Sequence, residues 1–226
     1  MGKQVYYAAI VNILHRRYCR SDAWRQAVHH GMMPWVLGEV DLGANVLEIG
    51  PGPGVTTDWL RERVPSLTCV EIDRKLANAL KARLEGTNVT VVEGDATAME
   101  FADATFDTAV CFTMLHHVPA RALQDSLLAE AHRVLKPGGR FYCLEFSKVT
   151  LAPVGRVYDA YSSRALPFFG RIIAKDAESY RYLHESIRRF PPQRELARRM
   201  REVGFANVAW RDMTLGVVAL HSGWRI

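Results

Sequence analysis

Apolar positions along the chain fall into short continuous runs that alternate with stretches of helical spacing. Five such runs predict buried strands at 45–49, 67–72, 89–92, 106–114 and 141–146. Strands that alternate with helices through at least five units are typical of a parallel, doubly wound sheet. Two further runs, 206–213 and 216–221, are too close together for a crossover helix, so we expect an antiparallel pair. The pattern therefore predicts an α/β, Rossmann-like, mostly parallel seven-stranded sheet that ends in an antiparallel hairpin.

The remaining pattern predicts one domain over residues 1–226. After Glu145 the alternation stops, and the tyrosine- and arginine-rich stretch that follows contains no clean strand, which indicates a helical insertion after strand five. We expect this insertion to cover the ligand edge of the sheet as a lid. The four predicted parts are N-terminal helices (1–40), a ligand-binding core (41–146), the helical insertion (147–192), and the last helix with the hairpin (193–226).

Helix boundaries are predicted from capping and breaking residues. Ser21 and Asp22 offer a cap for a helix over 23–30, and Pro34 opens a second short helix that ends near Gly38. Further helices are predicted over 56–64, through Leu76, Leu80 and Leu84, over 123–135 and over 193–203, with Pro137-Gly138-Gly139 ending the helix before the fifth strand.

Composition excludes several classes. With 226 residues, 49% hydrophobic and 23% charged, the chain has the balance of a globular protein rather than a disordered or fibrous one. The net charge of +5 is too small to indicate nucleic acid, and its excess lies after residue 139. The four cysteines form no C-x-x-C pair, so we expect no metal site and a reduced, cytoplasmic protein. No apolar run is long enough to span a bilayer, and we expect no signal peptide.

A glycine-rich turn follows the first predicted strand, where Glu48 to Gly54 reads E-I-G-P-G-P-G. Glycine lets the backbone approach a ligand where a Cβ atom would clash. The alternate spacing and two prolines differ from the G-x-G-x-x-G turn of dinucleotide sites. Glu71 ends the second strand, where a carboxylate can accept hydrogen bonds from two ribose hydroxyls. Asp95 follows the third strand, where a carboxylate can accept from an adenine amino group.

These elements, in this order and with a C-terminal hairpin, resemble the class I S-adenosylmethionine-dependent methyltransferases. The resemblance implies S-adenosylmethionine as cofactor, with the glycine turn facing its methionine part and Glu48 organising its amino end directly or through water. A cap or loop contact for Glu48 and solvated strand-end charges for Glu71 and Asp95 are the alternatives. The cofactor residues implied are Glu48, Gly50, Gly52, Gly54, Thr56, Glu71, Ile72, Asp95, Ala96 and Thr113.

The last third of the chain is similar to a narrower family. The segments that carry the similarity are Cys143–Lys148, Tyr158–Ser162, Asp176–Leu183 and Thr214–His221. They closely resemble the UbiE family, the C-methyltransferases of ubiquinone and menaquinone biosynthesis. The resemblance implies that the small-molecule substrate is a polyprenyl hydroquinone, methylated on a ring carbon.

The first 139 residues resemble generic small-molecule methyltransferases instead. Gly50–Gly54 stands where the UbiE family has a G-G-T-G turn, and Thr113–Val118 stands where its fourth strand ends in Phe-Gly-x-Arg-Asn. We therefore expect a change of resemblance near residues 135–139. A natural mosaic, a divergent member and an engineered chimera are equally consistent with this pattern.

C-methylation of a hydroquinone needs a base that removes a phenolic proton and later a ring proton. His116 and His117 follow the fourth strand at the ligand edge, and the ordinary histidine pKa of about 6.5 suits this role. The alternative is that one of the pair packs or caps. Tyr158, Asp159 and Tyr180 of the insertion are candidates for holding the substrate ring, with simple lid packing as the alternative.

Other functions fit the same residues less completely. The acceptor atom could be O, N or S of another small molecule, or the chain could bind the cofactor without catalysis. Since no N/D-P-P-Y-type base-pocket motif follows the fourth strand, we expect no nucleic-acid partner. The insertion mixes arginines with apolar residues, which fits peripheral contact with an anionic bilayer and a solvated basic face equally well.

Overall fold

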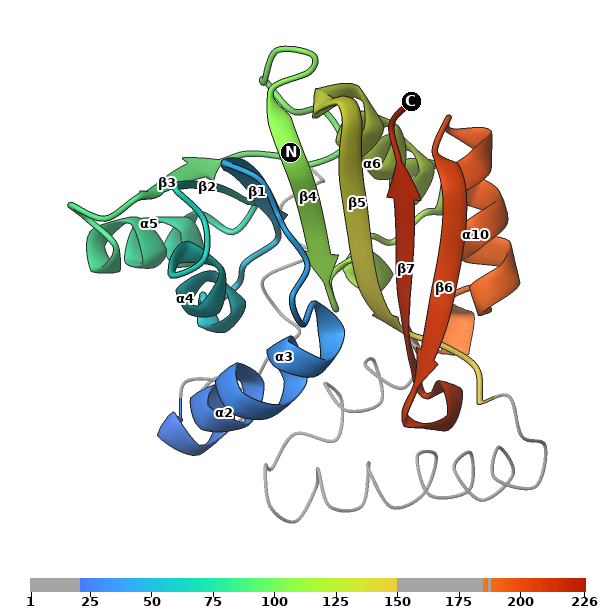
Figure 1. The fold of residues 1–226 in the computed structure, drawn as a ribbon, viewed down its shortest axis with the longest axis horizontal. Helices are drawn as coiled ribbons and strands as arrows, with labels where there is room; N and C mark the ends of the chain where they lie inside the picture. Colours follow the sequence, from blue (N-terminus) through green and yellow to red (C-terminus); the bar gives the residue numbers. More distant parts are fainter. Residues whose placement is uncertain (1–20, 150–184, 187) are drawn as a thin grey trace.

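A seven-stranded sheet carries the fold, with strand order β3-β2-β1-β4-β5-β7-β6 (Figure 1). The computed structural model describes residues 21–149, 185–186 and 188–226. Strands β1 to β5 are parallel, and β7 runs antiparallel to both its neighbours, β5 and β6. The predicted doubly wound α/β fold with an antiparallel hairpin is therefore confirmed. The strands are β1 (Asn45–Ile49), β2 (Ser66–Glu71), β3 (Val89–Glu93), β4 (Phe106–Phe112), β5 (Leu135–Phe146), β6 (Ala206–Met213) and β7 (Val218–Trp224).

Helices cover the two faces of the sheet because its strands are apolar on both sides. Helices α6 and α10 pack with Leu47 on one face, whereas α3, α4 and α5 pack with Val46 on the other. None of the helices in the described part of the chain is long and apolar enough to cross a membrane. The helical segments are α2 (Asp22–Ala27), η1 (Val28–Met32), α3 (Met33–Val36), α4 (Val55–Arg61), α5 (Arg74–Arg83), η2 (Leu115–His117), α6 (Arg121–Val134), α10 (Gln193–Glu202) and η4 (Thr214–Gly216).

The N-terminal helical segment is continuous, which differs from the prediction of two separate helices. Ser21 caps α2 as predicted, its hydroxyl accepting from the Trp24 amide at 3.2 Å. Residues 28–32 then form a π-helical turn that leads directly into α3. Pro34 has no amide hydrogen, so regular α-helical bonding cannot pass through it, and the wider turn takes up the mismatch.

The helix before β5 ends earlier than predicted. Strand pairing begins at Leu135, opposite Phe106, and Pro137-Gly138-Gly139 lies in a register shift of the strand rather than at a helix end. The last carbonyls of α6 are taken by other amides, since Thr105 donates to Val134 at 2.8 Å. A helix can end without a breaking residue when its final carbonyls find such partners.

Strand order places the candidate site. It reverses between β1 and β4, because β2 and β3 continue to one side of β1 and β4 begins the other side. In open α/β sheets, ligands bind outside the carboxyl ends of the strands at such a point. The segments that follow β1 and β4 are therefore where the sheet presents its residues to a ligand.

Candidate cofactor and catalytic site

Thr113 follows β4 directly and lies at the carboxyl edge of the sheet, on the β4 side of the point where the strand order reverses. It is exposed and has a φ of +48°, a left-handed conformation that is rare for a β-branched residue. Its amide donates to the carbonyl of Leu144 on β5 at 2.7 Å, which holds it there. Backbone strain of this kind concentrates at functional sites, which fits the prediction that Thr113 faces the cofactor.

The three turn glycines serve different purposes, although all have positive φ. A Cβ atom on Gly50 would lie 2.3 Å from Cγ of Met114, and one on Gly54 would lie 2.3 Å from Cδ1 of Leu80. These two glycines are required by packing within the protein. A Cβ atom on Gly52 would meet no atom of the described residues within 4 Å. Gly52 is therefore the turn glycine that leaves open space for a ligand.

Glu71 lies beside that open position at the end of β2. Its Oε2 accepts from the Gly52 amide at 3.0 Å and its Oε1 from the Asp73 amide at 2.9 Å. Burial raises the pKa of Glu71, and the two amides oppose that shift only in part. Each carboxylate oxygen can accept more than one hydrogen bond, so ribose hydroxyls can bind while the turn is held. The neighbouring Ile72 is half-buried.

Asp95 follows β3, one strand further along the same edge. Its Oδ1 accepts from the amide of Thr97 at 2.9 Å and from its hydroxyl at 2.7 Å, a turn that fixes the direction of the exposed carboxylate. Ala96 beside it is buried. Adjacent strands lie about 4.8 Å apart, so the glycine turn, Glu71 and Asp95 span about 10 Å, the scale of a nucleoside.

Glu48 occupies a different position from the three residues along the edge. It is 2% exposed, and its carboxylate accepts from the hydroxyls of Thr56 and Thr57 in α4, the second at 2.5 Å. Burial raises the pKa of Glu48, against the effect of these hydrogen bonds. Glu48 and Thr56 thus attach α4 to β1 directly beneath the turn. Their direct contact with the cofactor stays a prediction.

An ion pair that was not predicted from the sequence, between buried Asp58 and exposed Arg83, supports the glycine turn from outside. Asp58 of α4 is 5% exposed and accepts from Nη1 of Arg83 with both oxygens, at 2.7 and 2.8 Å. Nη2 of the same guanidinium donates to the carbonyl of Gly54 at 3.1 Å. Since 25 residues separate the partners, no local pattern in the sequence indicates the pair.

His116 lies in η2, shortly after β4, and its side chain is buried. Its side chain is 1% exposed, and its Nδ1 lies 2.8 Å from Oε2 of Glu145, a fully buried carboxylate on β5. The His117 ring lies against it, with ring centroids 4.0 Å apart. Glu145 was not among the predicted site residues. The other predicted substrate residues, Tyr158, Asp159 and Tyr180, lie outside the described residues.

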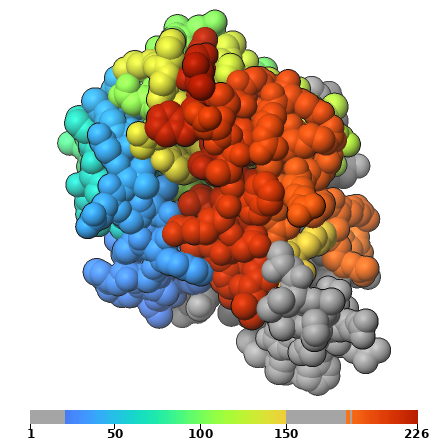
Figure 2. Space-filling model, turned by 45° about the vertical axis from the view of Figure 1, so that its right-hand side comes forward, coloured from blue at the N-terminus to red at the C-terminus, as the bar shows by residue number. Residues whose placement is uncertain are grey.

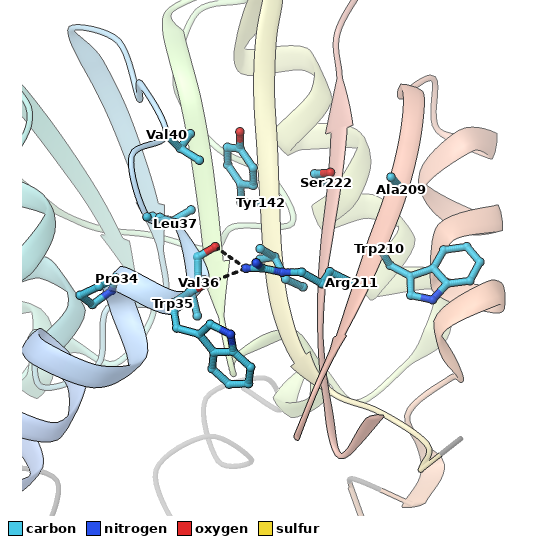
Figure 3. A pocket seen from close by; sticks show the side chains of 12 residues that line it. Pro34, Trp35, Val36, Leu37, Val40, Tyr142, Ala209, Trp210, Arg211 and Ser222 are labelled. Atoms are coloured by element: carbon cyan, nitrogen blue, oxygen red, sulfur yellow. Dashed lines mark hydrogen bonds between the residues drawn. The ribbon is translucent and has the colours of Figure 1, made fainter. Parts of the chain in front are cut away.

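A surface groove of about 500 Å³ lies elsewhere, between α3 and the C-terminal hairpin (Figures 2 and 3). Tyr142 of β5 lines it between two half-exposed tryptophans, Trp35 and Trp210. Arg211 bridges it, donating to the carbonyls of Trp35 and Val36 at 2.6 and 3.0 Å. None of the described candidate site residues lines this groove.

Comparison with known proteins matches residues 18–225 to the ubiE/COQ5 methyltransferase family. The chain is 45% identical over 157 residues to "Ubiquinone/menaquinone biosynthesis C-methyltransferase UbiE" of Rhodopseudomonas palustris (strain HaA2), covering 70% of this chain and 60% of that protein. It is 38% identical over 211 residues to the protein of the same name from Brucella anthropi, covering 90% of this chain and 77% of that one. The chain thus spans less than two thirds of the first of these relatives.

The family match covers both halves of the chain. The expected change of resemblance near residues 135–139, with a generic first part, is therefore not supported. Among solved structures, a SAM-dependent methyltransferase from Thermotoga maritima matches with a TM-score of 0.65 at 19% identity, covering 93% of this chain and 95% of that one. At that identity the likeness supports the fold alone.

Proposed function

This chain belongs to the ubiE/COQ5 methyltransferase family, and we propose that it transfers a methyl group from S-adenosylmethionine to a ring carbon of a polyprenyl hydroquinone. The proposal draws on the names of the relatives, on the family match and on the residues at the carboxyl edge of the sheet. The observation that carries it is the corner formed by Gly52 and Glu71, where open space meets a buried carboxylate held by two amides.

The residues at the edge fit such a cofactor in three places. The space above Gly52 suits the methionine part, Glu71 suits the ribose hydroxyls, and Asp95 suits the adenine amino group. When bound, the cofactor supplies a methyl group on a sulfonium. The chain's own contribution is to align the acceptor carbon with that methyl group and to exclude water.

The test is binding followed by turnover. Isothermal titration with S-adenosylmethionine should give a one-to-one complex, and Asp95→Ala should weaken it. Unchanged affinity in that variant would contradict the site assignment. Incubation with labelled cofactor and a panel of hydroquinones, catechols and amines then identifies the acceptor. Label on an O, N or S atom would replace the quinol proposal with the alternative methyltransferase, and binding without turnover would indicate a non-catalytic protein.

We also propose peripheral contact with an anionic membrane on the cytoplasmic side, since a polyprenyl substrate resides in the bilayer. The support is the arginine-rich insertion, of which Arg188 and Arg189 are described and exposed. A flotation assay with vesicles containing anionic lipid should recover the protein at low salt and lose it at high salt. Absence of binding at low salt would remove this part of the proposal.

A further inference from the structure

His116 is held in one orientation by Glu145. The carboxylate accepts from the His116 main-chain amide at 3.3 Å through Oε1, and its Oε2 lies 2.8 Å from the ring nitrogen Nδ1. The amide of Phe146 donates to Oε2 at 3.3 Å. Because strands β4 and β5 are paired, with Phe112 opposite Leu144, the sheet itself sets the distance between the two side chains. The ring can therefore neither rotate nor withdraw without breaking several contacts.

The second ring nitrogen of His116 has no such contact. Nε2 is buried and has no hydrogen-bond partner in the described part of the chain. A carboxylate that accepts from Nδ1–H leaves the lone pair of a neutral imidazole on Nε2. A buried polar atom without a partner is unfavourable by about 1–3 kcal/mol, and a ligand that bonds to it removes that cost. What Nε2 lacks is a hydrogen-bond donor.

The surroundings indicate which donor fits. Phe146 meets the imidazole edge-on with centroids 5.3 Å apart, and Phe190 does so at 6.5 Å. An apolar corner with aromatic walls favours an aromatic ring as neighbour. The segment also touches the cofactor turn, because Met114 packs against Gly50 so closely that a Cβ atom there would lie 2.3 Å away. A phenol that donates to Nε2 would thus lie close to the site proposed for the methyl donor.

We propose that His116 is the general base that takes the phenolic proton of the acceptor and that Glu145 is the residue that positions it; this rests on the proposed function. The phenolic O–H bond breaks, and its proton bonds to Nε2. The ring carbon ortho to the resulting phenolate forms the new C–C bond while the C–S bond of the sulfonium breaks, its electron pair remaining on sulfur. Loss of the ring proton to solvent restores aromaticity and leaves a phenolate, and Nε2 then returns its proton to the phenolate oxygen. The base is regenerated, and one proton is released for each methyl group transferred.

Two substitutions of histidine to asparagine distinguish the loss of the catalytic base from a loss of stability. His116→Asn keeps an amide in the position of Nδ1, so the contact with Glu145 survives, whereas Nε2 is lost. We expect kcat to fall by roughly 10²- to 10⁴-fold with cofactor affinity unchanged. His221→Asn is the matched control, since His221 is 1% exposed and bonds through Nε2 to the carbonyl of Gln193 at 3.0 Å, while its buried Nδ1 has no hydrogen-bond partner among the described residues. It should lose stability and keep kcat.

A spectroscopic measurement tests the proton transfer without turnover. Nitrohydroquinone, added at a pH at which it is neutral in solution, should show its phenolate band on the wild-type protein and none on His116→Asn. Glu145→Gln should also abolish the band, because the amide can donate to Nδ1 and force the proton onto Nε2. Adding imidazole to His116→Ala should restore part of the activity, which a structural histidine would not allow.

The outcomes distinguish the two proposals. If the wild type methylates a hydroquinone and His116→Asn has the same kcat and the same phenolate band, His116 is not the base. The proposed function would still stand. No transfer to any hydroquinone by the wild type would overturn the proposed function itself. If circular dichroism shows that His116→Asn does not fold, the phenolate band of Glu145→Gln is the deciding measurement. A retained phenolate band in Glu145→Gln would overturn the inference.

Discussion

Gly52→Ala should separate cofactor binding from folding. The added methyl group would meet no atom within 4 Å in the part of the chain that the structure describes, and the backbone has a φ of +55°. A left-handed L-residue costs roughly 1–2 kcal/mol of folding free energy. The methyl group would project into the space proposed for the cofactor, where overpacking costs about 1–3 kcal/mol. Since each 1.4 kcal/mol is a factor of ten, we expect roughly 5- to 150-fold weaker binding of S-adenosylmethionine.

Gly86→Ala is the matched control for this change. Gly86 also has positive φ, +76°, and a Cβ atom there would likewise meet none of the described atoms within 4 Å. It precedes β3 and so lies at the amino end of a parallel strand, away from the candidate site. Both variants should therefore lose a similar 1–2 kcal/mol in urea unfolding, by the same conformational cost. Only Gly52→Ala should lose cofactor affinity in calorimetry.

Two results would refute this reasoning. Equal cofactor affinity in Gly52→Ala and the wild type would show that the open space above Gly52 is not the cofactor site. An equal loss of affinity in Gly86→Ala would show that affinity follows global stability rather than local contact. Gly54→Ala extends the series, because its Cβ atom would lie 2.5 Å from Nη2 of Arg83 and should reduce stability and affinity together.

Three further predictions follow from the contacts around the edge. Arg83→Lys removes the guanidinium that joins Asp58 to the Gly54 carbonyl and should weaken cofactor binding several-fold. Arg63→Lys is the control and should leave binding unchanged, because Nη1 of Arg63 donates to the carbonyl of Trp59 at 2.9 Å and not to the turn. Equal dissociation constants for Arg83→Lys and the wild type in calorimetry would contradict the support that Arg83 gives to the turn. Burial raises the pKa of Glu71, so its acceptor carboxylate should be lost on acidification at a pH above the ordinary glutamate value of 4.5. Cofactor affinity should fall there in the wild type and stay flat in Glu71→Gln; parallel profiles would refute the ribose role. Burial lowers the pKa of His221, so the neutral ring stabilises the fold above the ordinary value of 6.5, and stability should fall as the pH drops below it. In denaturant unfolding, the free energy of unfolding of His221→Asn should fall less steeply with decreasing pH than that of the wild type. The same pH dependence in both proteins would contradict a role of His221 in acid sensitivity.

Most of the fold could be predicted because its strands are short, apolar and bounded by turn residues. The predicted bounds of β1 and β6 match the structure, and the antiparallel hairpin followed from the short gap between its strands. The errors arose where hydrogen-bond pairing in the folded chain decides. The π turn before Pro34 and the register shift at Pro137-Gly138-Gly139 depend on which carbonyls and amides find partners in the folded chain.

The candidate site divides in the same way. The glycine turn, Glu71 and Asp95 could be placed from the sequence because each follows a predicted parallel strand, and such ends meet at one edge. Position on a strand does not give side-chain contacts. The sequence therefore did not indicate that Glu48 lies under α4, where its carboxylate accepts from two threonine hydroxyls. The Arg83–Asp58 pair and the partner of His116 join segments 25 and 29 residues apart, so only the packed structure indicates them.

The central claim is methyl transfer to a ring carbon, and one experiment tests it directly. The purified protein is incubated with S-adenosylmethionine labelled with ¹³C in its methyl group and with a prenylated hydroquinone kept reduced, and the product is examined by NMR. We expect a new aryl methyl carbon and loss of one ring hydrogen, with no label on oxygen. A labelled methoxy carbon, or no labelled product from a protein that binds the cofactor, would contradict it.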